Sequence, residues 1–566
     1  MQNLKNTVAL ELERLSGGAV KSDEIVMLLA YPPDDKMGDI ALPCFKFAKA
    51  MRKSPVLIAE GFAKEFSHPY IDKAEAVNGY LNFFVADSYW TEVLVPGILE
   101  KKENYGRSEG GKGKTAVFDY SSPNICKPFH VGHLRSTIIG HALKKIYDFC
   151  GWDCVGINHL GDFGTQFGKQ IAAYKMWSSK EEIEKGGIEA LSALYVRYNN
   201  EAETNPELAD LARSEFHKLE MGDPENTELW KWFVSISVAE CEKTYKQLGV
   251  TFDSYAGEAF YSDKMDAQID IMRKAGILKI DDGATIVDLS DYNMPPCLIL
   301  KKDGSTLYPT RDIAAAAYRK DTYNFDLCAY VTAYQQCLHF AQWFKVVELM
   351  GHDFADKLVH VPYGMVSCNG EKLATRTGNV VLIKDLTGAA ISKVAKVMEE
   401  KNPGLASDVE TVEAVGVGAI VFYFLLNGRI KDIDFNMDDA LSFDGNTGPY
   451  AQYTYARCSS ILEKAGEYER DGIGGAYTSK DESFLAKELA RFTEVVESAA
   501  REFEPSGVVR YALDVCAAFN RFYHSSPIIS ADDENVKKKR LALVEATRYT
   551  LGSALHLVCM KTPSKI

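Results

Sequence analysis

The segment from residue 115 to residue 160 constrains the fold more than any other part of the chain. Residues 115–120 form a short apolar run, residues 131–149 repeat apolar side chains at helical spacing, and residues 155–160 are apolar again after a Gly-Trp-Asp turn. A strand, a helix and a second strand in this order are typical of a βαβ unit. We therefore predict an α/β fold with a doubly wound, Rossmann-like parallel sheet, whose ligands bind beyond the carboxyl ends of the strands.

Two histidines lie at the turn between this strand and this helix. His130 and His133 are three residues apart, so they share one face of the first helical turn, where unpaired backbone N–H groups and the helix dipole favour an anion. Gly132 between them has no side chain, which leaves room for a flat adenine base. A histidine pair at a helix start often only caps or packs, but its place in a βαβ unit favours a phosphate-binding site.

The length of 566 residues is enough for three or four domains. We predict a small N-terminal α+β domain over residues 1–100, because helical patterns there are followed by a strand pattern. An α/β domain then covers residues 112–430, with a helical insertion at about 170–300. Residues 431–566 are almost entirely of helical period and predict an all-helical C-terminal domain.

The net charge of −15 argues against a globally basic nucleic-acid-binding protein. Its distribution is more informative, because residues 1–90 carry a net charge of −2 and residues 441–566 a net charge of −1, which leaves −12 for the middle of the chain. Nearly neutral ends are compatible with an anionic partner, and an acidic middle with a small cationic substrate. Charge runs of this kind are nevertheless most often solvated faces.

The twelve cysteines are scattered, and the closest pair is Cys150 and Cys154. This spacing fits neither a zinc site nor a dense disulfide framework, so we expect no structural zinc and a reducing compartment. No signal-peptide pattern is visible at the N-terminus, and the longest uncharged apolar stretch, residues 414–428, is too short to span a membrane. We expect a cytoplasmic protein without a membrane partner.

Two stretches carry a family resemblance. Residues 121–140, which include His130, Gly132 and His133, resemble the signature region of class I aminoacyl-tRNA synthetases and specifically of arginyl-tRNA synthetases, and residues 158–168 match the same family. The similarity extends over essentially the whole chain. It implies an arginine–tRNA ligase that forms arginyl-adenylate from arginine and ATP in a tRNA-dependent step and transfers arginine to the 3′-terminal ribose of tRNA(Arg). Mg²⁺ is expected with ATP, with no dedicated metal site.

The resemblance assigns roles in ATP chemistry. It implies that His130 and His133 hold the phosphates and stabilise charge on the α-phosphate, while Gly132 and His339 belong to the nucleotide site. Residues 371–379 match the second ATP motif of class I enzymes.

Only one lysine of that second motif is kept. Lys372 stands at the first lysine position and Thr375 at the second. In relatives with such a degenerate motif, a lysine just before the first motif takes over, and here that residue is Lys127. We expect Lys127, Lys372 and Arg376 to share the neutralisation of the pyrophosphate leaving group.

A guanidinium group is planar and carries several donors, so a selective pocket should offer carboxylates and a polar or aromatic wall. Thr310 is predicted to be an N-cap, which would place Asp312 in the first turn of a helix. As a bare pattern, Asp312 there indicates only favourable helix-end electrostatics. The resemblance instead implies an arginine site made of Asp119, Asn124, Tyr308, Asp312 and Gln336.

Both ends of the chain resemble tRNA-binding parts of the family. Residues 444–457 are similar to the start of its anticodon-binding domain, in which Tyr450 could stack on an unpaired base. Asn78, Tyr80 and Asn82 resemble contacts of the N-terminal domain to the tRNA elbow. The basic run at residues 537–540 could meet phosphates or be a solvated helix face.

Two other functions stay open at this point. One is a non-catalytic tRNA-binding relative, against which the intact His130, His133, Lys372, Tyr308 and Asp312 argue. The other is a nucleotidyltransferase acting on a small metabolite, which would leave the N-terminal domain and the C-terminal helices unexplained. We expect a monomer with tRNA(Arg), L-arginine and ATP as its partners.

Overall fold

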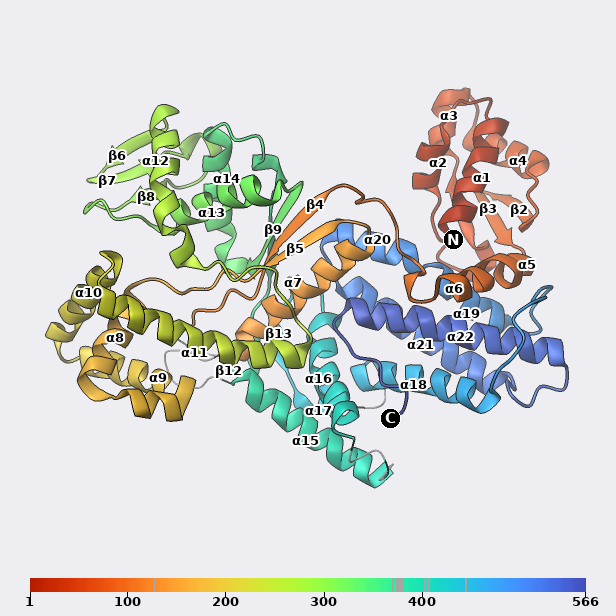
Figure 1. Ribbon diagram of the computed structural model, residues 1–566. Coiled ribbons are helices and arrows are strands. Elements are labelled where there is room, and N and C mark those ends of the chain that lie inside the picture. The colour runs from red at the N-terminus through yellow and green to blue at the C-terminus, as the bar shows by residue number, and fades with distance from the viewer. Residues whose placement is uncertain (126–128, 369–370, 373–380, 402–403, 405–407, 443–444) are drawn as a thin grey trace.

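The computed structural model describes the chain except for residues 126–128, 369–370, 373–380, 402–403, 405–407 and 443–444 (Figure 1). Its centre is a parallel sheet with the strand order β10-β9-β4-β5. The strands are β4 (Thr115–Asp119), β5 (Asp153–Ile157), β9 (Leu327–Ala333) and β10 (Leu358–Tyr363). The predicted Rossmann-like α/β fold is confirmed.

Helices cover both faces of this sheet, which is why its strands are mostly apolar. Alternate residues of β4 point to opposite faces: Phe118 belongs to the apolar cluster that contains α7 (Val131–Phe149), whereas Val117 belongs to the cluster of α13 (Tyr308–Tyr323) and α14 (Cys337–Leu349). The strand β4 therefore lies between two cores.

Helix α7 approaches the sheet very closely. A Cβ atom at Gly140 would lie 2.1 Å from the Cβ of Tyr120, the residue that follows β4. Ser136 of the same helix donates a hydrogen bond to the carbonyl of Val331 in β9 at 2.7 Å. The helix that begins next to His130 is thus fixed against two neighbouring strands.

The region between β5 and β9 begins as a helical unit with its own apolar cluster. Its helices are α8 (Thr165–Trp177), α9 (Lys180–Ala202), α10 (Pro206–Glu220) and α11 (Pro224–Leu248), followed by α12 (Met265–Lys274). The expectation of helix as far as residue 300 was wrong for its last part, where β6 (Leu278–Asp281), β7 (Ala284–Val287) and β8 (Cys297–Leu300) form an antiparallel sheet. Asp282 and Gly283, both with positive φ, make the hairpin turn that a helix could not contain.

The chain then returns toward α7 through a small mixed sheet and a pair of helices. The sheet has the order β12-β11-β13 and consists of β11 (Val366–Cys368), β12 (Glu371–Lys372) and β13 (Ile433–Phe435). The helices are α15 (Ile383–Lys401) and α16 (Val409–Leu426), and α17 (Met437–Ala440) follows β13. Helix α16 is apolar and long enough to cross a membrane, but 72% of it is buried against neighbouring elements, as in a core helix.

The N-terminal domain is an antiparallel sheet with helices, in the strand order β1-β3-β2. Its elements are α1 (Gln2–Leu15), α2 (Ser22–Leu28), β1 (Ile40–Pro43), α3 (Phe45–Met51), α4 (Pro55–Glu65), β2 (Ile71–Val77) and β3 (Tyr80–Val85), and α5 (Asp87–Tyr89) and α6 (Val95–Lys101) follow. The C-terminal region is helical: α18 (Gly448–Ala465), α19 (Lys480–Ala490), α20 (Phe492–Glu502), α21 (Ser506–Ser525) and α22 (Glu534–Leu557).

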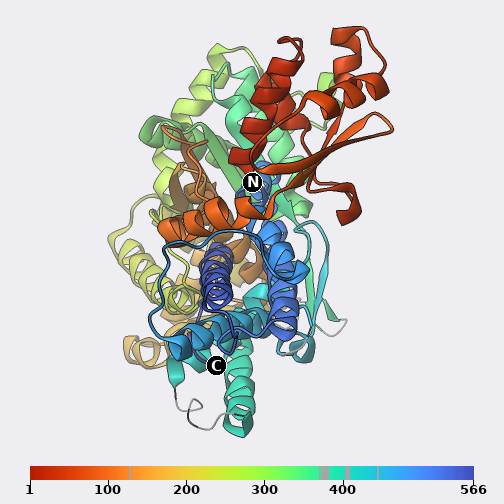
Figure 2. The ribbon, with the colours of Figure 1, turned by 90° about the vertical axis from the view of Figure 1, so that its right-hand side faces the viewer.

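These two terminal parts of the chain pack against each other (Figures 1 and 2). The Lys5 ammonium lies 2.7 Å from the Glu494 carboxylate, to which the Tyr31 hydroxyl also donates at 3.0 Å. Lys487 of α19 forms a second ion pair with Asp39 at 3.1 Å. Polar contacts between segments more than 400 residues apart therefore hold the N-terminal domain on the C-terminal helices.

The close approach of α7 gives a stability prediction. Gly140→Ala places a methyl group inside the contact radius of Tyr120, so we expect the free energy of unfolding to fall by about 1–3 kcal/mol. At Gly388 of α15, no atom lies within 4 Å of the position that a methyl group would take, so Gly388→Ala should be neutral or stabilising by about 0.5–1 kcal/mol. Urea denaturation measures the free energy of unfolding of both variants. Equal values for Gly140→Ala and Gly388→Ala would contradict the packing argument.

Candidate active site at the carboxyl end of the sheet

The two motif histidines cap α7. The N–H of Gly132 donates to Nδ1 of His130 at 3.1 Å, and the N–H of His130 donates to Nδ1 of His133 at 3.3 Å. The two rings lie with their centroids 3.9 Å apart. Because each Nδ1 accepts a backbone hydrogen bond, each neutral ring carries its proton on Nε2. Both imidazoles are therefore oriented to donate from Nε2 at the positive end of a helix dipole.

Gly132 is required by this arrangement. A Cβ atom there would lie 2.8 Å from Cε1 of His130. A side chain at this position would push the His130 ring away from the backbone N–H that fixes it. The glycine thus keeps the cap intact, in addition to leaving the helix start open.

The segment after the second motif returns to the first. The N–H of Val131 donates to the carbonyl of Val381 at 3.0 Å, and the N–H of Ile383 donates to the carbonyl of Phe129 at 3.2 Å. The Phe129 ring stacks on the His133 ring at 5.3 Å. Lys127 and Arg376 lie outside the described residues, and of Lys372 only the backbone, in β12, is described.

Asp119, predicted to bind arginine, already contacts an arginine of the chain. It ends β4, and its carboxylate lies 2.8 Å from the Arg319 guanidinium of α13, with both side chains at most 9% exposed. The Ser122 hydroxyl donates to the other carboxylate oxygen at 2.8 Å. His159 lies beside the same guanidinium at 3.2 Å, and burial lowers the pKa of this imidazole. Asp119 is thus held in place by a buried cation.

Helix α13 begins earlier than predicted. Its N-cap is Leu307 and Pro309 occupies the first turn, a position that proline favours. The prediction of Thr310 as N-cap was wrong, because its hydroxyl donates instead to the carbonyl of Ile299 in β8 at 2.8 Å. Asp312 consequently lies in the second turn of the helix.

The other arginine-site candidates gather where α13 and α14 begin. Nε2 of His339 donates to the Asp312 carboxylate at 2.6 Å, with about a quarter of each side chain exposed. Gln336 precedes α14 and is exposed, and Tyr308 is 64% exposed. His339, expected at the nucleotide, therefore touches the predicted arginine site. Asn124 lies in the loop after β4, where it forms a bridge with Gly161.

A buried ion pair beside Asp312 was not predicted. Arg311 donates to the Glu258 carboxylate at 2.8 Å, and neither side chain is more than 17% exposed. Burial raises the pKa of Glu258 to about 7 against the pull of Arg311, and burial likewise raises the pKa of Asp162 to about 6. Glu258 lies 53 residues before Arg311 in a stretch without a motif, so only the adjacency of Arg311 to Asp312 offered a signal.

The candidate tRNA contacts of the N-terminal domain differ in exposure. Asn78 is exposed and has a φ of 52°, as the turn between β2 and β3 requires. Tyr80 is 43% exposed and packs edge-on against Phe45, itself 53% exposed, at 5.5 Å. Asn82 is only 5% exposed. Of these candidates, Asn78 and Tyr80 face solvent.

In the C-terminal helices, Tyr450 is half-buried and its hydroxyl accepts a hydrogen bond from Asn520 at 2.8 Å. Tyr453 on the same helix is 42% exposed and lies under the Arg457 guanidinium at 4.8 Å. Of these two tyrosines, Tyr453, a residue absent from the predicted site, is the more exposed.

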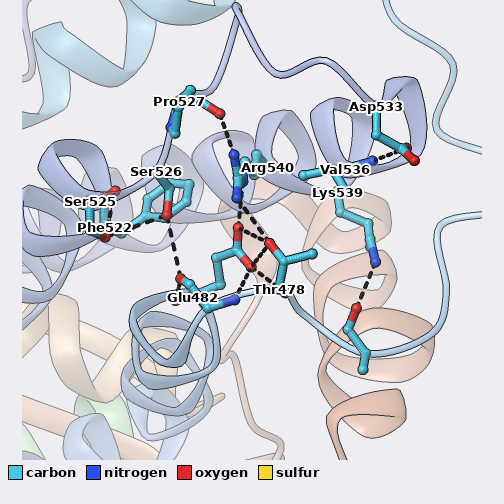
Figure 3. Close-up of polar contacts among 12 residues, drawn as sticks. Thr478, Glu482, Phe522, Ser525, Ser526, Pro527, Asp533, Val536, Lys539 and Arg540 are labelled. Atoms are coloured by element: carbon cyan, nitrogen blue, oxygen red, sulfur yellow. Dashed lines mark hydrogen bonds and ion pairs between the residues drawn. The ribbon is translucent and has the colours of Figure 1, made fainter.

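Side chains of the basic run at residues 537–540 form hydrogen bonds to other groups of the C-terminal region (Figure 3). Arg540 is 9% exposed and donates to the Glu482 carboxylate, the Thr478 hydroxyl and the carbonyl of Pro527. Lys539 donates to the carbonyl of Ala476 at 2.6 Å. These contacts favour a structural role over phosphate binding for Arg540.

Within the described part of the chain, no group of three His, Cys, Asp or Glu side chains is placed to hold a metal ion. The ten cysteines that the structure describes are free thiols.

Comparison with known proteins identifies three family domains along the chain. Residues 2–85 match the arginyl tRNA synthetase N-terminal domain, residues 94–437 match the catalytic domain of class I (R) tRNA synthetases, and residues 451–566 match the DALR anticodon binding domain. The matched segments together span nearly the whole chain.

Full-length relatives agree with this division. The chain is 50% identical over 545 residues to an arginine–tRNA ligase of Alkaliphilus metalliredigens, covering 96% of each chain, and 48% identical over 565 residues to one of Clostridioides difficile, covering 100% and 99%. The solved arginyl-tRNA synthetase of Thermus thermophilus superposes with a TM-score of 0.82 at 26% identity, covering 98% and 99%.

The buried Asp119–Arg319 pair gives a second prediction. Arg319→Leu leaves the Asp119 carboxylate buried without its counter-charge, so we expect a loss of about 3–5 kcal/mol in the free energy of unfolding. Asp119→Leu combined with Arg319→Leu removes both charges and should recover much of that loss. Denaturation of both variants measures this, and a double variant less stable than the single one would contradict the pairing.

Proposed function

The chain belongs to the class I arginyl-tRNA synthetase family, and we propose from this premise which of its residues perform each step. The protein is an arginine–tRNA ligase with ATP as a substrate. The alternative of a non-catalytic relative is not favoured. We propose that arginine is first converted to arginyl-adenylate in the presence of tRNA, and that the arginyl group then passes to the 3′-terminal ribose of tRNA(Arg).

We assign the ATP phosphates to the first turn of α7. His130 and His133 direct Nε2 donors from a helix N-terminus, and charge on the α-phosphate grows as the arginine carboxylate attacks it. Gly132 keeps the helix start open for the nucleotide, and ATP enters as its Mg²⁺ complex. We propose that Lys127, Lys372 and Arg376 neutralise the departing pyrophosphate.

We assign the substrate guanidinium to the starts of α13 and α14. The observation that carries this proposal is that His339, in the first turn of α14, binds the Asp312 carboxylate of α13, while Tyr308 begins α13 and Gln336 directly precedes α14. A carboxylate with an aromatic and an amide neighbour fits a planar cation with several donors. Asn124 and Asp119 lie at the end of β4, where they would face the rest of the amino acid.

The remaining assignments concern tRNA binding, the cellular compartment and the oligomeric state. We propose that residues 1–100 bind the tRNA elbow through Asn78 and Tyr80, with the buried Asn82 supporting the strand beneath them. Residues 112–430 catalyse, and residues 431–566 bind the anticodon loop with Tyr450 as a stacking face. The ten described free thiols support a reducing cytoplasm. We propose a monomer that works without a membrane.

The role of His133 predicts a catalytic defect. His133→Ala removes a donor at the α-phosphate, so we expect the rate of arginine attachment to tRNA to fall about 10²-fold or more, while the melting temperature stays close to wild type. The control is His217→Ala on the exposed face of α10, which should charge tRNA normally. Wild-type turnover of His133→Ala would refute the assignment.

The role of Asp312 predicts a loss of substrate affinity. Asp312→Asn removes the negative charge that opposes the guanidinium, so we expect KM for arginine to rise about tenfold or more, with little change in KM for ATP. Asp321→Asn, an exposed aspartate farther along α13, is the matched control. Equal changes in both KM values would indicate that Asp312 serves only the structure.

A further inference from the structure

Arg429 joins the C-terminal helices to the central sheet. Its Nε donates to the carbonyl of Phe503 at 3.0 Å, and its Nη1 donates to the carbonyl of Pro362 at 2.7 Å. Its backbone N–H donates to the Glu504 carboxylate at 3.1 Å. Phe503 and Glu504 connect α20 to α21, whereas Pro362 lies near the end of β10. One side chain therefore bridges the anticodon-binding helices and a strand of the catalytic domain.

Arg135 joins the same strand end to α7. This side chain is fully buried two residues after His133, and its Nη1 donates to the carbonyls of Gly364 and Met365 at 2.6 and 3.3 Å. Its Nη2 donates to the carbonyl of Gly428, the residue before Arg429, at 3.3 Å. The two guanidinium groups thus bind carbonyls within residues 362–365 from two different parts of the chain.

The segment bound by both guanidinium groups also packs closely against residues 429–432. A Cβ atom at Gly364 would lie 2.5 Å from the carbonyl oxygens of both Ile430 and Lys431. The N–H of Gly364 donates to the carbonyl of Arg429 at 2.8 Å, and the N–H of Met365 donates to the Asp432 carboxylate at 2.6 Å. The backbone at residues 364–365 is therefore fixed by both contact and hydrogen bonding.

Strand β11 starts directly after this segment. Val366 pairs with Ile433 of β13, and Cys368 pairs with Glu371 at the start of β12. Lys372, which we assign to pyrophosphate, is the next residue of β12. Any displacement of residues 362–365 consequently moves the strand of Lys372 relative to the α7 histidines.

We propose that Arg429 is a positioning residue for adenylate formation, which sets β11 and β12 against the start of α7 according to the position of the helices α20 and α21. The inference rests on the proposed role of Lys372. It adds a route by which the anticodon-binding helices influence the reaction rate through contacts that touch no substrate. Misplacement of reacting groups by about 1 Å is enough to slow a reaction severely.

The test compares Arg429→Met with the full-length wild-type enzyme. Methionine keeps an apolar stem but removes both side-chain hydrogen bonds, while the backbone bond to Glu504 remains. We expect kcat for tRNA charging to fall about tenfold, with KM for tRNA within twofold of wild type. The Arg429→Lys variant can keep one of the two side-chain hydrogen bonds, so its kcat should lie between that of Arg429→Met and that of wild type.

The matched control is Tyr147→Phe. The Tyr147 hydroxyl of α7 donates to the carbonyl of Ala500 in α20 at 3.0 Å, so this change also removes a buried hydrogen bond between the same two domains, but one that does not reach residues 362–365. We expect its kcat to stay within twofold of wild type. Thermal unfolding of all variants separates a loss of stability from a loss of rate.

Each possible result of these measurements supports or overturns the inference. A lowered kcat in Arg429→Met with normal kcat in Tyr147→Phe supports the inference. Unchanged kcat in Arg429→Met overturns it, as does a raised KM for tRNA with unchanged kcat or an equal kcat loss in Tyr147→Phe. Lys372→Ala is measured in parallel: normal kcat there refutes the proposed role of Lys372, independently of the result for Arg429.

Discussion

The close contact of α7 with the sheet is the constraint on which the site depends. With only a hydrogen at Gly140, the helix lies against Tyr120 at a distance that any side chain would prevent. This fixes the height of the helix start above the carboxyl end of β4, and hence where His130 and His133 face. Arg135, on the same helix, then fixes the segment that leads to the second motif. Gly140 therefore helps to set the positions of both proposed ATP motifs relative to β4.

Two carboxylates in the acidic middle of the chain are paired with arginines: Asp119 with Arg319 and Glu258 with Arg311, each in a mostly buried setting where an unpaired ion would be costly. Each pair contributes one positive and one negative charge and so leaves the net charge of this region unchanged. That net charge was a poor guide to the partner. Both ends of the chain, to which we assign tRNA, expose aromatic rings such as Tyr80 and Tyr453, which suits recognition by stacking more than by a broad basic surface.

Local patterns predicted local structure, and partners distant in the sequence could not be predicted. The βαβ unit follows from periodicity, and the position of His130 and His133 together at the start of the helix follows from their spacing, so both could be predicted. Capping by these histidines was only the alternative to phosphate binding in the sequence, and the structure shows it. Thr310 was misplaced because its hydroxyl bonds to a strand, which no local pattern reveals. The pairing of Asp119 with Arg319 joins residues 200 positions apart, and the contact of Arg429 with Pro362 joins β10 to the chain just after α16. Such contacts are set by tertiary packing, which spacing does not encode.

The two carboxylates assigned to the arginine site, Asp119 and Asp312, differ in the side chain that binds each of them in the absence of substrate. Asp119 is bound to a guanidinium that is 1% exposed and enclosed on every side, so this partner cannot leave without opening the core. Asp312 is bound to an imidazole about a quarter exposed, which the core does not enclose. An incoming guanidinium can therefore compete for Asp312 but not for Asp119. On this physical ground, we propose that discrimination for arginine falls on Asp312, and that Asp119 contributes a fixed charge distribution at the end of β4.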